Sequence, residues 1–171
     1  MSQFYEITPE QIEKNPFTMV GKEWMLIGAE KEGKVNAMTA SWGGVGVLWN
    51  KNVSFCFIRP QRYTKEFVDA ADRFSLSFFS EEHRKTLTHF GRVSGRDEDK
   101  IKTCGLTVAH AEGAPYFEEG NLILICKKLY AGKIEPESIL LPEIDETAYS
   151  EKDYHQVYIG EIVKVLMKVE D

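Results

Sequence analysis

Short apolar runs rich in β-branched and aromatic residues recur along the chain, separated by polar connections that contain glycine or proline. Most have the length of a single strand, and residues 74–79 alternate between apolar and small polar positions, as a half-buried strand does. The connection Glu30-Lys31-Glu32-Gly33 joins the first two runs, which are therefore expected to form a hairpin. Extended segments are predicted at 24–29, from 34 onward, and at 53–58, 74–79, 106–110, 121–134 (one long strand or a pair) and 157–169, where Gly160 is a candidate bulge.

Helical signals are fewer and shorter than strand signals. Thr64, followed by Glu66, predicts the cap of a helix over 64–71, and Ser80 predicts the start of a helix that ends near Phe90, before Gly91. Six or seven strands with two modest helices, in no regular alternation, favour an antiparallel barrel with outer helices over a doubly wound parallel sheet. The other segments are an irregular leader (1–20) with one helical turn at 8–11, a short helix at 97–102 and a surface excursion at 135–155.

Composition narrows the class of protein. The 171 residues fit one domain (1–171), and a formal net charge of −6 argues against a nucleic-acid partner bound through its phosphates. The N-terminal segment carries acids and prolines rather than a signal peptide, and no apolar run approaches the roughly 20 residues that span a membrane. The three cysteines are far apart and form no CxxC motif, which argues against a disulfide framework or a zinc knuckle. A soluble cytoplasmic protein with no membrane partner is expected.

Residues 34–65 hold the most suggestive chemistry. A strand of small and hydroxylated residues leads to Trp42 and a glycine cluster, and the next strand ends at two arginines and a threonine. Small residues let a flat ligand lie against backbone, aromatic residues wall it, and arginines hold an anion. The stretch therefore predicts a site for a ring that carries a phosphate.

The glycine cluster (43, 44 and 46) does not fit the known phosphate loops. Trp49 stands where GxGxxG requires its third glycine, and the chain contains no GK[ST]. These glycines are interpreted mainly as barrel bulges beside the site, although they could also let the backbone and Trp42 approach a ligand.

Arg59, Arg62, Thr64 and Lys65 surround the junction between a strand end and a helix start, where backbone N–H groups already favour an anion. A solvated basic turn that pairs with nearby acids explains the same spacing equally well. The four histidines lack zinc-site spacing, and no protein nucleophile or metal ligand set stands out. Redox chemistry would therefore depend on a bound cofactor.

Three segments together resemble a known family. They are Asn36-Ala37-Met38-Thr39-Ala40-Ser41-Trp42, Ile58-Arg59-Pro60-Gln61-Arg62-Tyr63-Thr64-Lys65 and Phe74-Ser75-Leu76-Ser77-Phe78. Their order is similar to that in the flavin reductase-like family of FMN-binding split β-barrels, which includes flavoredoxin. Shorter similarities follow at Phe90-Gly91, Ser94-Gly95-Arg96-Asp97, Asp99-Lys100, Tyr154-His155 and Tyr158-Ile159-Gly160-Glu161.

The resemblance implies a mainly β fold: a six-stranded antiparallel split barrel with a few peripheral helices. It also implies a homodimer that binds one FMN per subunit near the dimer interface. The strand from Asn36 to Trp42 would lie along the flavin ring. The phosphate and ribityl end would lie at Arg59, Arg62, Tyr63, Thr64 and Lys65, and Gly91, Arg92 and His155 would close the site from the same or the neighbouring subunit.

By this resemblance, the chain is expected to be an FMN-dependent oxidoreductase of flavin reductase type with NAD(P)H as electron donor. The alternative is a flavoredoxin-like electron carrier that docks a redox protein and has no small-molecule substrate. A split barrel that has lost its cofactor and acts as a binding module is a third possibility.

Overall fold

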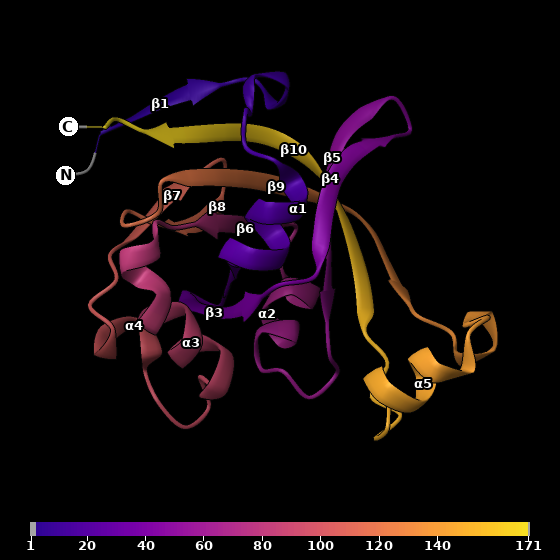
Figure 1. The fold of residues 1–171 in the computed structure, drawn as a ribbon. Coiled ribbons are helices and arrows are strands. Elements are labelled where there is room, and N and C mark those ends of the chain that lie inside the picture. Colours follow the sequence, from indigo (N-terminus) through magenta and orange to yellow (C-terminus); the bar gives the residue numbers. More distant parts are fainter. Residues whose placement is uncertain (1–2, 171) are drawn as a thin grey trace.

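The computed structural model describes residues 3–170, which form ten strands in two antiparallel sheets (Figure 1). The larger sheet has eight strands in the order β3-β2-β6-β9-β10-β5-β4, and β1 also pairs with β10. The strands of this sheet are β1 (Phe4–Ile7), β2 (Met25–Lys31), β3 (Lys34–Ala40), β4 (Gly43–Leu48), β5 (Lys51–Ile58), β6 (Arg73–Phe78), β9 (Leu122–Lys133) and β10 (Gln156–Lys168). The smaller sheet is a hairpin of β7 (Val108–Ala111) and β8 (Ala114–Phe117).

The fold is a mainly β antiparallel split barrel with a few peripheral helices, as predicted, but its main sheet has eight strands instead of six. One additional strand, β1, lies in the expected irregular leader and is held by pairing with the end of β10. The other, β4, contains the glycine cluster and pairs with β5 without a register shift. The interpretation of these glycines as bulges is therefore wrong.

Gly43 has a different structural role. Its φ is +145°, and a Cβ at this position would lie 2.6 Å from the carbonyl oxygen of Phe55. Only glycine therefore fits at this position, where β4 begins directly after Trp42 and runs close to the backbone of β5. The bulge predicted at Gly160 is confirmed, because the β10–β9 register shifts between Ile159 and Gly160.

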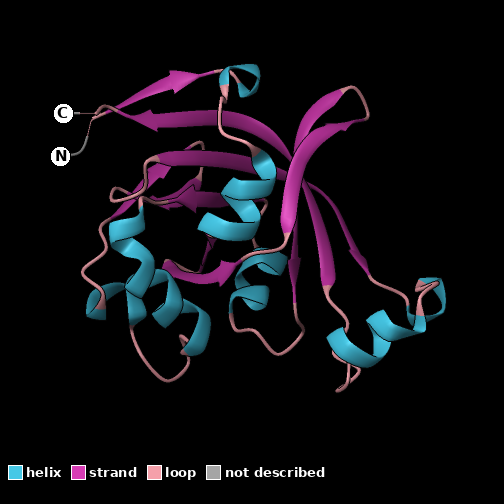
Figure 2. Cartoon of the chain, viewed as in Figure 1, coloured by secondary structure: helices cyan, strands magenta, loops and turns pink. Residues whose placement is uncertain are grey.

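The helices are short and mostly lie outside the sheet (Figure 2). The predicted helix at 64–71 is α2 (Thr64–Ala70), but Thr64 is its first helical residue and does not cap it. The predicted helix from Ser80 is a 3-10 turn followed by α3 (Arg84–Arg92), which continues through Gly91. The others are α1 (Pro16–Thr18), followed by a π-helical turn (Met19–Glu23), α4 (Lys100–Thr103) and α5 (Pro142–Ala148). No helix within residues 3–170 is long and apolar enough to cross a membrane.

The excursion at 135–155 is an arm with its own helix. Figure 1 shows β9 and β10 running beyond the barrel and carrying α5 away from the other helices. Pro142 occupies the first turn of α5, and two acids, Glu143 and Asp145, lie where they favour the helix dipole. We name residues 134–155 the arm.

Buried side chains lie on both faces of β2 and β3. Ile27 and Met38 belong to the main core, whereas Leu26 and Ala37 belong to a second cluster that also contains Leu87 of α3. A strand buried on both faces is fixed in register, because a one-residue slip would exchange the two sets. β3 is therefore a rigid support for any site beside it.

Candidate ligand-binding site

β3 lies at an edge of the main sheet and pairs only with β2. In an antiparallel pair, alternate residues direct their backbone N–H and C=O groups toward the partner strand and the others direct them away. The Ala37 carbonyl accepts a hydrogen bond from Lys100 Nζ (2.8 Å), which places it on the free edge. By the same alternation, Thr39 presents its backbone groups along this edge. A ligand beside β3 can therefore bind to main chain.

A hollow of about 210 Å³ lies beside the C-terminal half of β3. Trp42 is half exposed (50%), and its ring centroid lies 5.1 Å from that of His155. Phe57 packs edge-on against the same histidine. The lining residues are Met38, Thr39, Ala40, Ser41, Trp42, Phe57, Arg59, Arg62 and His155. Small side chains and aromatic rings thus form a hollow that suits a flat ring.

His155 is a buried, neutral member of this hollow. Its Nδ1 lies 2.8 Å from the hydroxyl of Tyr149, within the arm. Burial, and then the nearby Arg59 guanidinium, lowers the pKa of His155 to about 4. At neutral pH the imidazole therefore carries no charge and contributes shape and hydrogen bonding.

Arg59 ties the arm to the hollow. Its guanidinium forms an ion pair with Asp153 (2.9 Å) and donates a hydrogen bond to the carbonyl of Ala148 (3.0 Å). It also lies over the ring of Tyr149, 5.3 Å from the centroid. The charge of Arg59 is thus already paired, so its main effect is to hold the arm against the hollow's rim.

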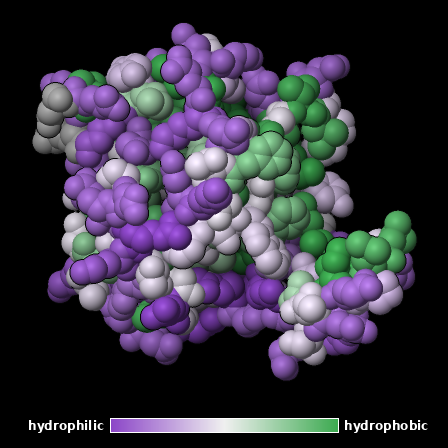
Figure 3. Space-filling view, viewed as in Figure 1, coloured by the Kyte–Doolittle hydropathy of each residue, from purple (hydrophilic) through white to green (hydrophobic). Residues whose placement is uncertain are grey.

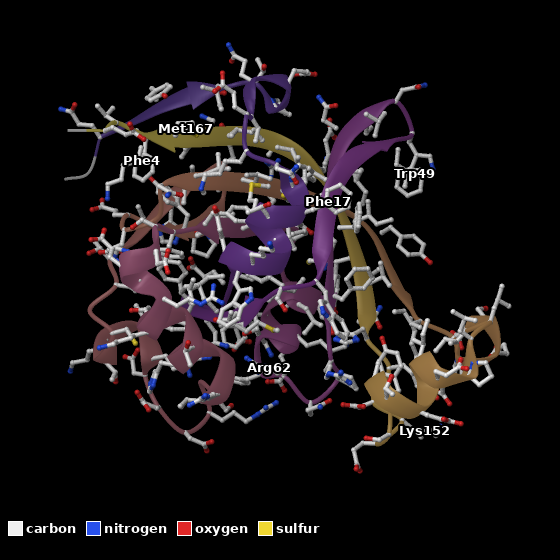
Figure 4. All side chains as sticks on the ribbon, in the orientation of Figure 1. Phe4, Phe17, Trp49, Arg62, Lys152 and Met167 are labelled. Carbon is white, nitrogen blue, oxygen red and sulfur yellow. The ribbon has the colours of Figure 1, made fainter. Side chains whose placement is uncertain are left out.

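Arg62 lies between this hollow and a second one. It donates to the carbonyl oxygens of Gly91 (2.9 Å) and Phe90 (3.1 Å), in the last turn of α3. Burial lowers its pKa, and no carboxylate among residues 3–170 hydrogen-bonds to it. Figure 4 shows Arg62 close to the start of α2.

The second hollow measures about 200 Å³ and borders the N-terminal half of β3. Asn36 Nδ2 donates to the hydroxyl oxygen of Thr64 (2.8 Å), and both side chains are buried. The lining residues are Asn36, Gln61, Arg62, Tyr63, Thr64, Arg92, Val93, Ser94, Gly95 and Lys100. Because Arg62 lines both hollows, they form two halves of one site along β3.

The structure brings most, but not all, of the sequence-predicted residues to this site. Ala37 is fully buried, and it contributes its backbone carbonyl rather than its side chain. Gly91 contributes the carbonyl that holds Arg62. Lys65 lies apart from both hollows, because its amine pairs with Asp69 (2.6 Å) on α2. The other predicted residues line one hollow or both: Asn36, Met38, Thr39, Ala40, Ser41, Trp42, Arg59, Arg62, Tyr63, Thr64, Arg92 and His155.

Sequence reasoning assigned no role to two of the site's important side chains. From the sequence, Phe57 cannot be distinguished from an ordinary strand residue, because the pattern of β5 does not indicate which face of the strand lies toward the site. Lys100 is part of the similarity around Asp99-Lys100, yet a lysine at a short helix start usually faces water. Its burial to 3% exposure depends on α4 packing beside β3, which is a tertiary effect.

The side chains and backbone of the site suit the binding of a ligand. Residues 3–170 contain no cluster of three or more His, Cys, Asp or Glu side chains that could hold a metal ion. The site instead offers the free backbone edge of β3, aromatic walls, the buried cation Lys100 and the partly buried cation Arg62. Such an arrangement fits a flat, anionic ligand whose own chemistry does the work.

Comparison with known proteins identifies related chains. The sequence model of the flavin reductase like domain matches residues 19–171. No curated protein sequence matches the chain significantly.

Solved structures with the same fold come from several organisms. Flavoredoxin from Methanosarcina acetivorans is 25% identical, with a TM-score of 0.65, over 84% of this chain and 67% of that one. An FMN-binding domain of a flavin reductases-like enzyme from Shewanella baltica is 15% identical, with a TM-score of 0.70, over 97% and 78%. A Streptomyces globisporus NADH:FAD oxidoreductase is 16% identical, with a TM-score of 0.63, over 85% and 74%.

Proposed function

Because the chain belongs to the flavin reductase-like domain family, we propose that it binds FMN along β3 and works as an oxidoreductase of flavin reductase type. The observation that carries this proposal is the free edge of β3 beside two joined hollows, with the cation Arg62 where they meet. A flavin needs a flat slot, hydrogen-bond donors at its pyrimidine edge and a group that holds its phosphate. The residues of this site fit all three needs.

FMN, when bound, supplies the hydride and electron chemistry. The chain's own residues hold and tune it. The backbone of Thr39 offers a fixed donor on the free edge, and a fixed donor stabilises negative charge better than mobile water does. Phe57 and neutral His155 form an apolar wall on one side of the hollow without adding a charge there.

The proposed electron donor is NADH or NADPH. The hollow is open at Trp42, whose side chain is half exposed, so a nicotinamide ring could approach a flavin held there. The structural relative from Streptomyces globisporus is itself an NADH:FAD oxidoreductase. No separate dinucleotide-binding motif is needed for a donor that stacks directly on the flavin.

An electron-carrier function is the second candidate, and two observations favour it. The 25% identical relative from Methanosarcina acetivorans is a flavoredoxin. A formal net charge of −6 would also steer the chain toward a basic redox partner. In that case a protein, rather than a nicotinamide, would exchange electrons with the bound flavin.

We also propose that the chain forms a homodimer. Several large apolar side chains are exposed on the β4–β5 hairpin and on the arm, and Figure 3 shows both groups toward the same edge of the molecule. They are Val47, Leu48 and Trp49 on the hairpin, with Leu140, Leu141 and Ile144 on the arm. Exposed apolar side chains gathered on one side of a molecule are typical of an interface.

Anaerobic reduction separates the two candidate functions. The chain, loaded with FMN, is mixed with NADH or NADPH in the absence of oxygen, and the flavin absorption band is followed in time. A flavin reductase bleaches the band within the first turnover. A band that stays unchanged with both nucleotides, yet bleaches with dithionite, contradicts the reductase function and supports the carrier.

A further inference from the structure

The two ring nitrogens of His155 have different surroundings. Nδ1 lies 2.8 Å from the hydroxyl of Tyr149. Nε2 has no hydrogen-bond partner within residues 3–170, and it keeps some accessible surface although the residue as a whole is only 7% exposed. Because His155 lines the first hollow beside Trp42 and Phe57, the unpaired nitrogen can meet a ligand there.

The hydrogen bond between Tyr149 and His155 has one favourable direction. Tyr149 is buried (4% exposed), and its hydroxyl forms no other hydrogen bond in the described part of the chain. If this hydroxyl accepted a proton from Nδ1, its own O–H would be buried without an acceptor, which is unfavourable. The hydroxyl of Tyr149 therefore donates to Nδ1.

This direction fixes the position of the imidazole proton. Burial raises the pKa of Tyr149, so the phenol keeps the proton that it donates. Burial, and then the Arg59 guanidinium, lowers the pKa of His155 to about 4, so the ring is neutral at pH 7 and carries a single N–H. Since Nδ1 accepts a hydrogen bond, that N–H is at Nε2.

Tyr149 is itself held firmly within the arm. The Arg59 guanidinium lies 5.3 Å from the centroid of its ring and also donates to the carbonyl of Ala148, the preceding residue (3.0 Å). The ring of Tyr154 packs against it at 4.7 Å between centroids. The phenol thus has its position before any ligand arrives, and a donor held in advance needs no reorganisation on binding.

We infer that Tyr149 is a positioning residue, whose hydroxyl holds the imidazole of His155 so that Nε2–H donates to a carbonyl oxygen of the ring bound in the first hollow. The inference rests on the proposed function, because it requires a flavin, or the nicotinamide that approaches it, in this hollow. Both rings carry amide-type carbonyl groups. Tyr149 does not line the hollow, so it acts only through His155.

The first experiment observes the imidazole of His155 by ¹⁵N NMR in the full chain, freed of flavin, at pH 7. His155→Gln identifies its signals by their loss. The proton is expected on Nε2, and Tyr149→Phe should shift the Nδ1 resonance toward that of a nitrogen that accepts no hydrogen bond. A proton on Nδ1 in the unaltered chain, or an Nδ1 resonance unchanged by Tyr149→Phe, would overturn the inference.

The second experiment measures the effect of Tyr149→Phe on ligands. A loss of about three- to tenfold, equivalent to one neutral hydrogen bond, is expected in one of two constants. If the carbonyl belongs to the flavin, the dissociation constant of FMN rises; if it belongs to the nicotinamide, the KM for NADH rises instead. Tyr130→Phe is the control, because Tyr130 is 48% exposed and lines neither hollow. No change in either constant contradicts the inference.

A double-mutant cycle separates positioning from a purely structural role. In a chain that already carries His155→Ala, Tyr149→Phe should cause no further loss, because the only path from Tyr149 to the ligand is gone. Additive losses would show that Tyr149 acts independently of His155 and would overturn the inference. Failure of the unaltered chain to bind FMN would instead contradict the proposed function, and the NMR result, obtained without flavin, keeps the two failures distinct.

Discussion

Gly95 shows how closely the α3–α4 connection approaches β3. A Cβ at this position would lie 2.1 Å from Asn36 Oδ1 and 3.2 Å from the ring of Tyr63. Asn36 is 6% exposed and is held by its bond to Thr64, so it cannot turn away without losing that bond. The wall of the second hollow therefore depends on a glycine that has no unusual backbone conformation.

The substitution Gly95→Ala is expected to weaken FMN binding between about three- and tenfold, the equivalent of one lost neutral hydrogen bond. The physical reason is displacement of either the Asn36 side chain or the connection from α3. Fluorescence titration with FMN measures the effect. Gly21→Ala is the matched control, since a Cβ there meets no atom within 4 Å; similar affinities for both variants would contradict this account of Gly95.

His155 gives the folded chain a pH dependence in the acid range. Its pKa is lowered to about 4 in the folded state from 6.5 in the unfolded state, so the unfolded chain binds more protons between these values. The free energy of unfolding should therefore fall as the pH drops from about 6.5 to about 4, by an amount on the order of 2 kcal/mol from this residue.

Urea unfolding of the native chain and of His155→Gln across pH 4 to 7 measures that contribution. The variant cannot titrate at this position, so its stability should fall less over the range than that of the native chain. Parallel pH profiles for the two proteins would show that His155 is not held neutral by its surroundings.

At the scale of elements, the β4–β5 hairpin depends on Gly43. A side chain there would combine a φ of +145° with a 2.6 Å approach to the Phe55 carbonyl oxygen, which belongs to the backbone and cannot move aside. Gly43→Ala should lower the free energy of unfolding by about 2 kcal/mol.

Gly46→Ala is the matched control for this prediction, because it lies in the same strand and a Cβ there meets no atom within 4 Å. Its stability should differ from that of the native chain by less than about 0.5 kcal/mol. Both values come from chemical denaturation. Equal stability of the two variants would contradict the role given to Gly43.

Elements whose signals are local could be predicted from sequence. The Glu30-to-Gly33 connection is a local turn signal, and the structure has β2 and β3 on either side of it. β1 could not be predicted, because a four-residue strand is stable only through its pairing with β10. The first turn of α5 did carry helix signals, Pro142 and two acids, but they lie in a segment too polar to reveal an apolar face.

The candidate site likewise has a part that could be predicted from the sequence and a part that could not. Small residues followed by Trp42 are a local pattern, and they do line the first hollow. Packing between elements distant in sequence decides whether a basic side chain lines a hollow or forms an ion pair with an acid. That is why Lys65, paired with Asp69, could not be distinguished from Lys100, which reaches Ala37 from 63 residues away.

At the scale of the whole molecule, the arm and the β4–β5 hairpin expose apolar surface that a second copy would cover. Figure 4 shows Trp49 at the tip of the hairpin, on the side of the molecule that carries the arm. Leu140 and Leu141 are 89% and 60% exposed. Burying both in a dimer would favour association by a few kcal/mol.

The double substitution Leu140→Ser and Leu141→Ser is therefore expected to convert a dimer to a monomer at micromolar concentration, as measured by sedimentation velocity. Tyr5→Ser is the control, because Tyr5 is 51% exposed on β1 but lies on neither apolar segment. A native chain that sediments as a monomer would contradict the proposed homodimer.

We propose that the free edge of β3 and its two hollows hold FMN. The most direct test is the visible absorption spectrum of the purified chain, supplemented with FMN and passed through a desalting column. The expected result is a yellow protein with a flavin band, from which acid releases FMN at close to one molecule per chain. A colourless protein that retains no FMN, and does not quench its fluorescence on titration, would contradict it.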